Sequence, residues 1–367
     1  MEIKLGFVGD IMPGGVLHNR TLWVQDELQQ IFDSLDLRIG TLECAIGDTP
    51  TFDPVKMGLK QDVIYAPNSD LKKLSKLRIN CVSLANNHAF DLGAEGLKNT
   101  IAQLDKLGIA HCGAGMNATE AITPAILTIK GKTIGLIGLC DYRDETVGYV
   151  PIATDSSPGM NSIKDGKYIN QIKHLKEITD YVIIIIHWGI EHSFWPTPAM
   201  LDVARKCIDS GADIIVGGHQ HRVQPITEIK GHPIFWGLGN FLFPARFLTP
   251  PRPMYYPSEN EDTSQYPITD VYPWVSQPTL KVWKRLGRIG TLGIVEINNR
   301  EFSPTQILLE LKDDKELRMA DGGTVKRNER IELRIVKFSI SKLPYNVVYF
   351  CKRAIYGVIN RLNHIFG

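Results

Sequence analysis

Side chains that can bind a metal ion follow several apolar segments of this chain. His219 and His221, separated by one residue, come directly after residues 214–218, which read IIVGG. His187 follows the apolar run at 181–186 in the same way. Loops that leave the carboxyl ends of neighbouring parallel strands converge at one edge of a sheet. The pattern therefore predicts a polar site where these segments end.

Other polar residues have the same placement: Asp10 after residues 5–9, Glu43 after 39–42, and Asn86, Asn87 and His88 after 82–85. Taken singly, an Asp or Asn after a strand is typical of a turn or a helix cap, and a lone histidine is typical of a side chain whose hydrogen bonds are satisfied within the protein. Capping requires no imidazole and no repeated placement at strand ends. The set as a whole therefore favours a shared site.

Two carboxylates, one amide and three imidazoles make a ligand set of mixed nitrogen and oxygen donors. The set contains no cysteine, so a soft thiolate site is not expected, and its imidazole nitrogens beside oxygen donors suit Mn, Fe or Zn better than Ca or Mg. In turning backbone, the two histidines of His219-Gln220-His221 can be directed to two neighbouring ions. Gly217 and Gly218 allow the chain to turn sharply and to approach the ions closely.

The elements that must position these residues alternate along the chain. Strands are expected at 5–10, 37–43, 79–85, 125–129, 133–139, 181–187 and 212–218, and helices at 66–77, 94–107, 167–179 and 197–210. This alternation is typical of an α/β core. The paired segments 125–129 with 133–139, and 225–230 with 231–239, predict a second, partly antiparallel sheet. We therefore expect two packed sheets with helices outside.

The later part of the chain has a different character. Residues 244–278 are rich in proline and aromatic residues, so we expect a long surface loop, either a plain ordered loop or one wall of a binding groove. A strand is expected at 290–297, and further strands or a small appendage at 303–311 and 330–340. Residues 343–366 have the spacing of an amphipathic helix, which packs on its own domain or docks on a membrane surface.

Composition limits the partners and the cellular setting. The chain has 41 Lys and Arg against 40 Asp and Glu, a formal net charge of +1, so no overall electrostatic field attracts nucleic acid. The expected substrate is a small molecule or a polymer. The six cysteines contain no CxxC pair and are expected to be reduced. The N-terminus lacks the apolar core of a signal peptide. We therefore expect a cytoplasmic protein; its oligomeric state stays open.

Five short motifs occur in a fixed order: GDIM, TLE, NNHAFD, HWGIE and GGHQH, followed by GLGNFLF. Together they resemble the CapA family, which is associated with bacterial poly-gamma-glutamate capsule synthesis and is a branch of the calcineurin-like metallophosphoesterase superfamily. The resemblance covers residues 1 to about 300. It implies an α/β (α+β) four-layer sandwich, with two mixed sheets flanked by helices over residues 1–299 and a C-terminal extension over 300–367.

The resemblance also implies roles for individual residues. It implies ligands for one or two divalent ions: Asp10 and His221 for the first, Asn87, His187 and His219 for the second, and Glu43 bridging them. It implies further roles close to the ions: His88 as general acid or electrostatic stabiliser, Asp91 to orient His88, and Glu191 to support the ligands or contact the substrate. The implied activity is metal-dependent hydrolysis of a phosphoester or an amide.

Two features depart from the superfamily pattern. The usual Asp-x-His reads Asp10-Ile11-Met12, which leaves the first ion one imidazole short, and Glu43 stands where an Asp is usual. His18 either substitutes for the missing imidazole or is a surface histidine. We also expect no N-terminal membrane anchor of the kind common in the family, which weakens the inference that the protein works on a capsule polymer at the cell surface. The alternative function is an accessory protein of polymer synthesis that keeps the pocket to bind a ligand without hydrolysis.

Overall fold

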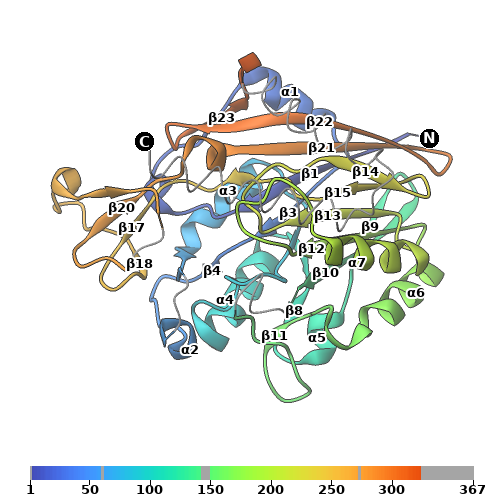
Figure 1. Ribbon diagram of the computed structural model, residues 1–367, viewed down its shortest axis with the longest axis horizontal. Helices are drawn as coiled ribbons and strands as arrows, with labels where there is room; N and C mark the ends of the chain where they lie inside the picture. The colour runs from blue at the N-terminus through green and yellow to red at the C-terminus, as the bar shows by residue number, and fades with distance from the viewer. Residues whose placement is uncertain (1, 59–61, 142–148, 272–273, 324–367) are drawn as a thin grey trace.

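The computed structural model describes residues 2–58, 62–141, 149–271 and 274–323. Within these ranges the strands form two large sheets that pack face to face (Figure 1). The expected strand at 330–340, the amphipathic helix at 343–366 and Cys351 lie outside the described residues.

The first sheet has β1 (Ile3–Ile11) near its centre. Its order in the described chain is β2 (Trp23–Val24), β23 (Glu316–Met319), β22 (Glu301–Lys312), β21 (Ile289–Asn298), β1, β3 (Leu37–Leu42), β6 (Cys81–Ser83) and β7 (Ala110–Cys112), with β16 (Asn240–Leu242) also paired to β1. Strands β1, β3, β6 and β7 are parallel to one another, whereas β21 is antiparallel to β1. The carboxyl ends of β3, β6 and β7 therefore lie at the same edge of the sheet as the carboxyl end of β1.

The second sheet is also mixed. Its order in the described chain is β14 (Ile226–Ile229), β15 (His232–Phe235), β13 (Ile214–Gly218), β12 (Tyr181–His187), β10 (Lys132–Cys140) and β9 (Ala125–Ile129). The central strands are parallel, and the two edge strands are antiparallel to their neighbours. Both edge strands come from the hairpins expected from the sequence.

Alternation along β12 shows how the layers are built. Ile183 and Ile185 point into the core between the two sheets, where they meet residues such as Phe7 of β1. Val182 and Ile184 point to the other face, into the core beneath the helices. Because neighbouring side chains of a strand face opposite ways, a continuous apolar run is what a strand buried on both faces requires.

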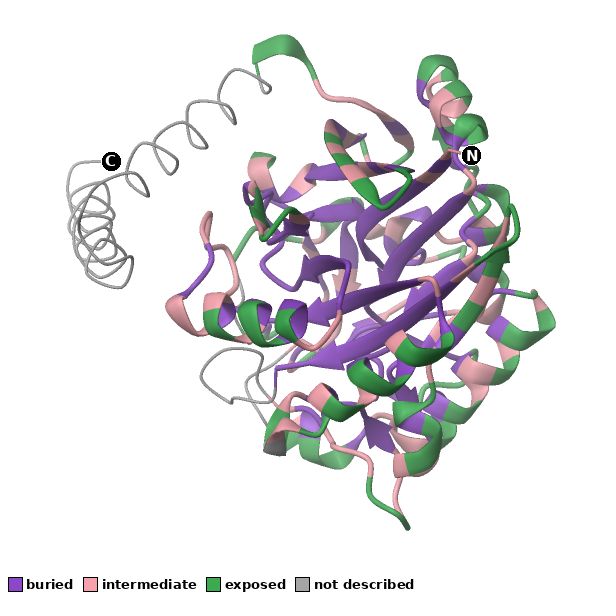
Figure 2. Ribbon diagram, turned by 90° about the vertical axis from the view of Figure 1, so that its right-hand side faces the viewer, coloured by how far each residue is buried: buried purple, intermediate pink, exposed green. Residues whose placement is uncertain are grey.

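Helices cover the outer faces of both sheets. Buried residues of α1 (Asp26–Ser34), α3 (Lys72–Lys76) and α4 (Gly93–Lys106) pack against the first sheet, and those of α6 (Tyr168–Ile178) and α7 (Pro198–Asp209) against the second. In Figure 2 the strands are buried between helices whose outer faces are exposed. The predicted α/β fold with two packed mixed sheets flanked by helices is confirmed.

Smaller elements lie between these layers. They are α2 (Pro54–Gly58), α5 (Ala118–Ile122), the strand pairs β4 (Ala45–Ile46) with β5 (Tyr65–Ala66) and β8 (Ala114–Gly115) with β11 (Gly159–Met160), and the 3-10 turns η1 (Gly15–Leu17), η2 (Asn68–Leu71), η3 (Lys164–Gly166), η4 (Thr263–Gln265) and η5 (Arg285–Arg288). The helix expected at 66–77 is therefore split between η2 and α3.

The loop predicted at 244–278 is corrected by the structure. It contains β17 (Arg246–Leu248), β18 (Met254–Tyr255) and β19 (Ile268–Thr269), which form a small sheet with β20 (Thr279–Lys281) in the described chain. Prolines at 250, 251 and 253 interrupt the backbone donors of this segment, so each strand is limited to two or three residues. Such short strands leave no periodicity that a sequence can reveal.

The boundary predicted after residue 299 falls in the turn between β21 and β22. These strands pair over ten residue pairs, from Ile289 with Glu310 to Asn298 with Glu301. Residues up to Met319 therefore belong to the first sheet rather than to a separate extension. A boundary in a hairpin is not visible from composition, because both strands have the same character.

Other features of the described residues bear on the setting of the protein. Cys44, Cys81, Cys112, Cys140 and Cys207 are all buried and carry free thiols. Within the described ranges, helices fall short of the length and apolar character that a membrane crossing needs.

Candidate metal centre

Six predicted ligands meet at the carboxyl ends of strands from both sheets. Asp10 lies near the end of β1, and Glu43 directly follows β3. His187 is the last residue of β12, and His219 follows β13. Together with His221 and Asn87 they are almost completely removed from solvent. The packing of the two sheets therefore brings together side chains up to 211 positions apart in the sequence, from Asp10 to His221.

Nε2 of His187 is at the centre of one group of ligand atoms. It lies 2.8 Å from Oδ1 of Asn87, 3.2 Å from Nδ1 of His219 and 3.2 Å from Oε1 of Glu43. Ligands about 2.1 Å from a zinc ion stand roughly 3.0–3.4 Å from one another in octahedral or tetrahedral arrangements. The two separations of 3.2 Å match that spacing and the one to Asn87 is shorter, so Glu43, His187 and His219 can hold one divalent ion.

Asp10, Glu43 and His221 form a second group. Nδ1 of His221 lies 3.5 Å from Oδ2 of Asp10, and Nε2 of His221 lies 3.8 Å from Oε1 of Glu43. Glu43 belongs to both groups, which places it between two neighbouring ion positions. The grouping is the one that the family resemblance implies; ligation itself stays a prediction.

Several buried atoms of these groups make no hydrogen bond within the described chain: Oδ1 of Asp10, both carboxylate oxygens of Glu43, and Nδ1 of His187. Burial is the main cause that raises the pKa of Asp10 to about 7 and the pKa of Glu43 well above its usual range. Burial likewise lowers the pKa values of His187 and His221. Buried carboxylates are stable when paired with a cation, so the residues present fit a divalent metal.

The backbone of the His219-Gln220-His221 loop is unusual. His219 has φ 94° and His221 has φ 48°, in the left-handed region that residues other than glycine rarely adopt. The backbone N–H of His219 donates to Oδ2 of Asp10 at 3.2 Å. Strained conformations of this kind persist where the surroundings enforce them, and they concentrate at functional sites. The strain allows two histidines one residue apart to reach different ligand groups.

Gly217 is the position in β13 where a side chain has least room. A Cβ atom there would lie 2.0 Å from the carbonyl oxygen of Trp236 and 2.4 Å from Nε1 of Trp188. We expect Gly217→Ala to destabilise the protein by about 3 kcal/mol or more, because a backbone carbonyl cannot move aside. Urea unfolding measures this loss. Gly58→Ala is the matched control, since a Cβ atom at Gly58 meets no atom within 4 Å; equal stability of both variants would contradict the prediction.

The position of the missing imidazole is occupied by a core residue. Met12 is fully buried in the apolar cluster beside the first sheet. His18 does not supply a replacement, because its Nδ1 is 2.9 Å from Oδ2 of Asp70 and it is absent from both ligand groups. Asn240 lies opposite Asp10 in the pairing of β16 with β1, with its Oδ1 2.8 Å from Nδ1 of His221.

Asn240 was not predicted as a site residue, although the GLGNFLF motif contains it. Its side-chain nitrogen donates to the carbonyl of Gly287 at 2.7 Å, which turns Oδ1 toward His221. A hydrogen bond to one ring nitrogen of a metal-binding histidine fixes which nitrogen faces the ion. Asn240 therefore directs Nε2 of His221 toward Glu43. The sequence feature that could have identified Asn240 is its position directly after a glycine-rich turn.

His88 and Asp91 form a buried pair beside the ligands. Nδ1 of His88 lies 2.7 Å from Oδ2 of Asp91, which also accepts a hydrogen bond from the backbone of Ile64 at 2.7 Å. The other oxygen of Asp91 lies 3.0 Å from Nζ of Lys56, a fully buried residue of α2 that also donates to the carbonyl of Asn87. Sequence reasoning missed Lys56, because it follows no strand.

Glu191 is outside both ligand groups. The pKa of its carboxyl is raised to about 7, chiefly by burial and then by the charge of Asp62, while Lys281 and Arg246 act against the rise. Lys281 and Arg246 are buried and both pair with Asp62, Lys281 at 2.6 Å. The pKa of Glu191 thus depends on a buried ion-pair cluster of Asp62, Arg246 and Lys281, which sequence reasoning also missed because its two cations come from β17 and β20.

The raised pKa of Glu191 predicts a pH effect on stability. The pKa of this carboxyl is about 7 in the folded protein and 4.5 in the unfolded chain. Its contribution to stability is complete below about pH 4.5 and is lost as the pH rises through about 7. We expect the wild-type chain to lose more stability than Glu191→Gln between about pH 5 and about pH 8, measured by urea unfolding. Parallel profiles of the two proteins would contradict the prediction.

The fold and the buried ligands define a two-sheet α/β protein with a candidate divalent-metal centre at its strand ends. The chain belongs to the family described as bacterial capsule synthesis protein PGA_cap, which matches residues 4–245. The resemblance to the CapA family is thereby confirmed.

Individual relatives support the same assignment. PGA biosynthesis protein CapA of Bacillus subtilis (strain 168) is 30% identical over 247 residues, which cover 66% of this chain and 63% of that protein. Capsule biosynthesis protein CapA of Bacillus anthracis is 32% identical over 184 residues, covering 49% and 44%. The matched segment thus spans less than two thirds of either relative. Among solved structures, a hypothetical protein from Thermus thermophilus has a TM-score of 0.44 and 14% identity, covering 84% of this chain and 99% of that one.

Proposed function

We propose that this protein is a metal-dependent hydrolase of the phosphoesterase type that works in the synthesis of a capsule or cell-envelope polymer. The observation that carries the proposal is the pair of ligand groups sharing Glu43, with buried oxygens that lack hydrogen-bond partners in the described chain. The link to a polymer rests on the family and on relatives named for capsule or PGA biosynthesis.

Divalent ions in such a site supply positive charge that stabilises the transition state of hydrolysis. The protein contributes the ligands on rigid strand ends, which hold their positions without reorganisation. Asn240 fixes the ring of His221 through a hydrogen bond at 2.8 Å to Nδ1, the ring nitrogen away from the proposed ion.

His88 is the group that we assign to proton transfer. An ionised Asp91, paired with Lys56, can only accept a hydrogen bond, so Nδ1 of His88 carries the hydrogen. Nε2 is then the nitrogen that exchanges a proton with the leaving oxygen. Burial lowers the pKa of His88 below its usual value, and the charge of Asp91 acts against that lowering.

The test combines metal analysis with a turnover assay on the purified full chain. We expect one or two Mn, Fe or Zn ions per chain, and hydrolysis of bis-p-nitrophenyl phosphate or p-nitrophenyl phosphate that chelation abolishes and metal restores. A protein without bound metal would refute the proposal. Bound metal without turnover, unaffected by His88→Ala, would instead support the ligand-binding accessory function.

A further inference from the structure

Arg246 is a buried arginine close to the candidate metal centre that has no role in the proposed proton transfer. Hydrogen bonds fix the chain on its N-terminal side: the backbone N–H of Met12 donates to the carbonyl of Leu242 at 2.7 Å, and that of Val16 donates to the carbonyl of Ala245 at 2.8 Å. Met12 directly follows β1. The start of β17, which Arg246 occupies, is therefore held beside the carboxyl end of β1.

Two aromatic rings, those of Phe243 and Trp283, neighbour both Arg246 and His221. Cζ of Arg246 lies 5.6 Å and 5.5 Å from the ring centres of Phe243 and Trp283, within the range of a cation–π contact. The same two rings lie 5.4 Å and 4.9 Å from the ring of His221, measured between centroids. The guanidinium is therefore one aromatic ring away from a predicted ligand.

The charge of Arg246 reaches the ligand that both groups share. Burial is the main cause that raises the pKa of Glu43, followed by the charge of Asp10, and the charge of Arg246 acts against that rise. It acts in the same way on Glu191, whose pKa is raised to about 7 chiefly by burial. A cation that stabilises negative charge at these positions also stabilises an anion bound among them.

The hydrogen-bond donors of Arg246 are only partly used within the described chain. Nη2 donates to Oδ2 of Asp62, an oxygen that also accepts from Nζ of Lys281 at 2.6 Å. Nε of Arg246 is buried without a hydrogen-bond partner among the described residues. A buried donor on a charged group that lacks a partner is destabilising. A bound molecule with an acceptor oxygen is therefore expected to stabilise this side chain.

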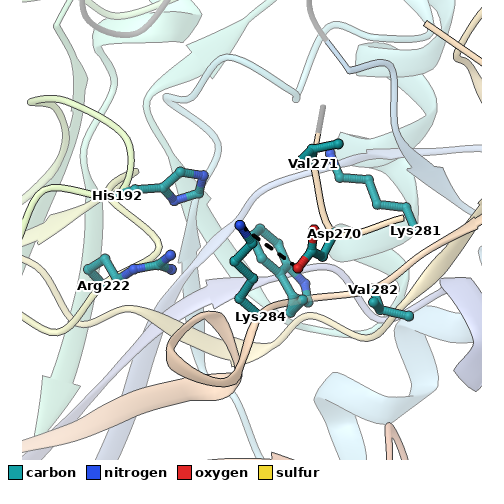
Figure 3. Close-up of a pocket in the computed structure, with 8 residues that line it drawn as sticks. His192, Arg222, Asp270, Val271, Lys281, Val282 and Lys284 are labelled. Atoms are coloured by element: carbon teal, nitrogen blue, oxygen red, sulfur yellow. Dashed lines mark ion pairs between the residues drawn. The ribbon is translucent and has the colours of Figure 1, made fainter. Parts of the chain in front are cut away.

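Two neighbours of Arg246 line a cavity of about 250 Å³ (Figure 3). They are Lys281, which shares the carboxylate of Asp62 with Arg246, and Trp283, whose ring contacts the guanidinium. The cavity also borders on His192, in the loop after β12. A group bound between Arg246 and the ligands therefore has space beside it for the rest of a substrate.

We propose that Arg246 binds an anionic oxygen of the phosphoryl group that is hydrolysed at the candidate metal centre. The inference rests on the proposed function, because it places that group between the guanidinium and the ions. Asp62 and the rings of Phe243 and Trp283 hold the guanidinium in place before an anion arrives, so binding requires little reorganisation. The planar donors of an arginine match the oxygens of a phosphoryl group. Arg246 thus stabilises negative charge on these oxygens during hydrolysis.

The test measures binding of inorganic phosphate to the purified, metal-loaded full chain by calorimetry. We expect the affinity to fall about 10-fold in Arg246→Lys, which keeps a positive charge beside Asp62 but lacks the Nε donor and the planar fork. We expect a fall of about 100-fold in Arg246→Gln, which also loses the charge. Metal content, measured by mass spectrometry, should stay unchanged in both variants, because Arg246 is not a ligand.

Arg38→Lys is the matched control. Arg38 is also buried, and its Nε donates to the carbonyl of Arg78 at 2.8 Å. It lies near the amino end of β3, the end away from Glu43. The phosphate affinity of Arg38→Lys should therefore equal that of the wild type. Urea unfolding of every variant separates a lost fold from a lost contact.

Several results would overturn the proposal: no measurable phosphate binding by the metal-loaded chain, equal affinity in the wild type and both Arg246 variants, an equal loss in Arg38→Lys, or binding that persists unchanged after chelation. Phosphate binding that depends on Arg246 but is not accompanied by turnover would refute hydrolysis and not the anion site. Turnover with binding independent of Arg246 would refute only the anion site. If Arg246→Gln does not fold, Arg246→Lys carries the test, because it keeps a cation for Asp62.

Discussion

Replacing Glu43 by glutamine is expected to remove metal from both positions of the centre at once. Glu43 belongs to both ligand groups, and its two oxygens are buried without hydrogen-bond partners in the described chain. Loss of a residue that hydrogen-bonds to a metal ligand already weakens metal binding about 10- to 100-fold. Loss of a ligand shared by both groups should therefore weaken metal binding by more than about 100-fold. Metal content after dialysis, measured by mass spectrometry, gives the effect.

The shared position also predicts a pattern among the other ligands. His219→Ala and Asp10→Asn should each reduce the metal content by one ion, because each residue belongs to a single group, whereas Glu43→Gln should reduce it by two. If the protein holds only one ion, one of the two single-group variants should retain it. Glu228→Gln, on the edge strand β14, is the control. Full metal content in Glu43→Gln would contradict the bridging role.

The second large effect is expected at His88. We expect His88→Ala to lower turnover about 10²- to 10⁴-fold, the usual contribution of a positioned acid or base, while metal content stays unchanged. The reason is that His88 binds Asp91 rather than a ligand group: its Nδ1 lies 2.7 Å from that carboxylate. Steady-state kinetics with a nitrophenyl phosphate substrate and a parallel metal analysis measure both quantities.

A control histidine is available on the surface. His174→Ala removes an imidazole of α6 whose side chain is 75% exposed, and it should leave turnover unchanged. If His88→Ala loses metal, His88 is a ligand and its assigned role is wrong. If turnover persists at the wild-type rate, proton transfer is carried by another group, and Glu191 becomes the first to test.

Much of the candidate site could be predicted because strand ends can be read from local sequence. The run 181–187 consists of residues that suit a strand buried on both faces, and it ends in a histidine. The same holds for 214–218 before His219. Since parallel strands end at one edge of a sheet, the placement of imidazoles and carboxylates implied a common site before any distance was known.

The residues that were missed have no such local signal. Lys56 lies in a five-residue helix, and Arg246 and Lys281 lie in strands of three residues among prolines and aromatics. Their positions beside the centre depend on ion pairs: Lys56 pairs with Asp91, and Arg246 and Lys281 pair with Asp62. In each pair the two partners are separated in the sequence by other elements. Side chains gathered by long-range pairing leave no periodic trace.

The sequence by itself therefore determined the layered α/β fold, the positions of its buried strands along the chain and the residue types at their ends, because these depend on hydrophobic periodicity and on the geometry of single strands. The tertiary structure alone decided which of those ends face one another, that Glu43 lies between two ligand groups, that Asn240 sets the ring of His221, and that residues 301–319 complete the first sheet. The physical reason is that these facts depend on the packing of two sheets, which no local pattern records.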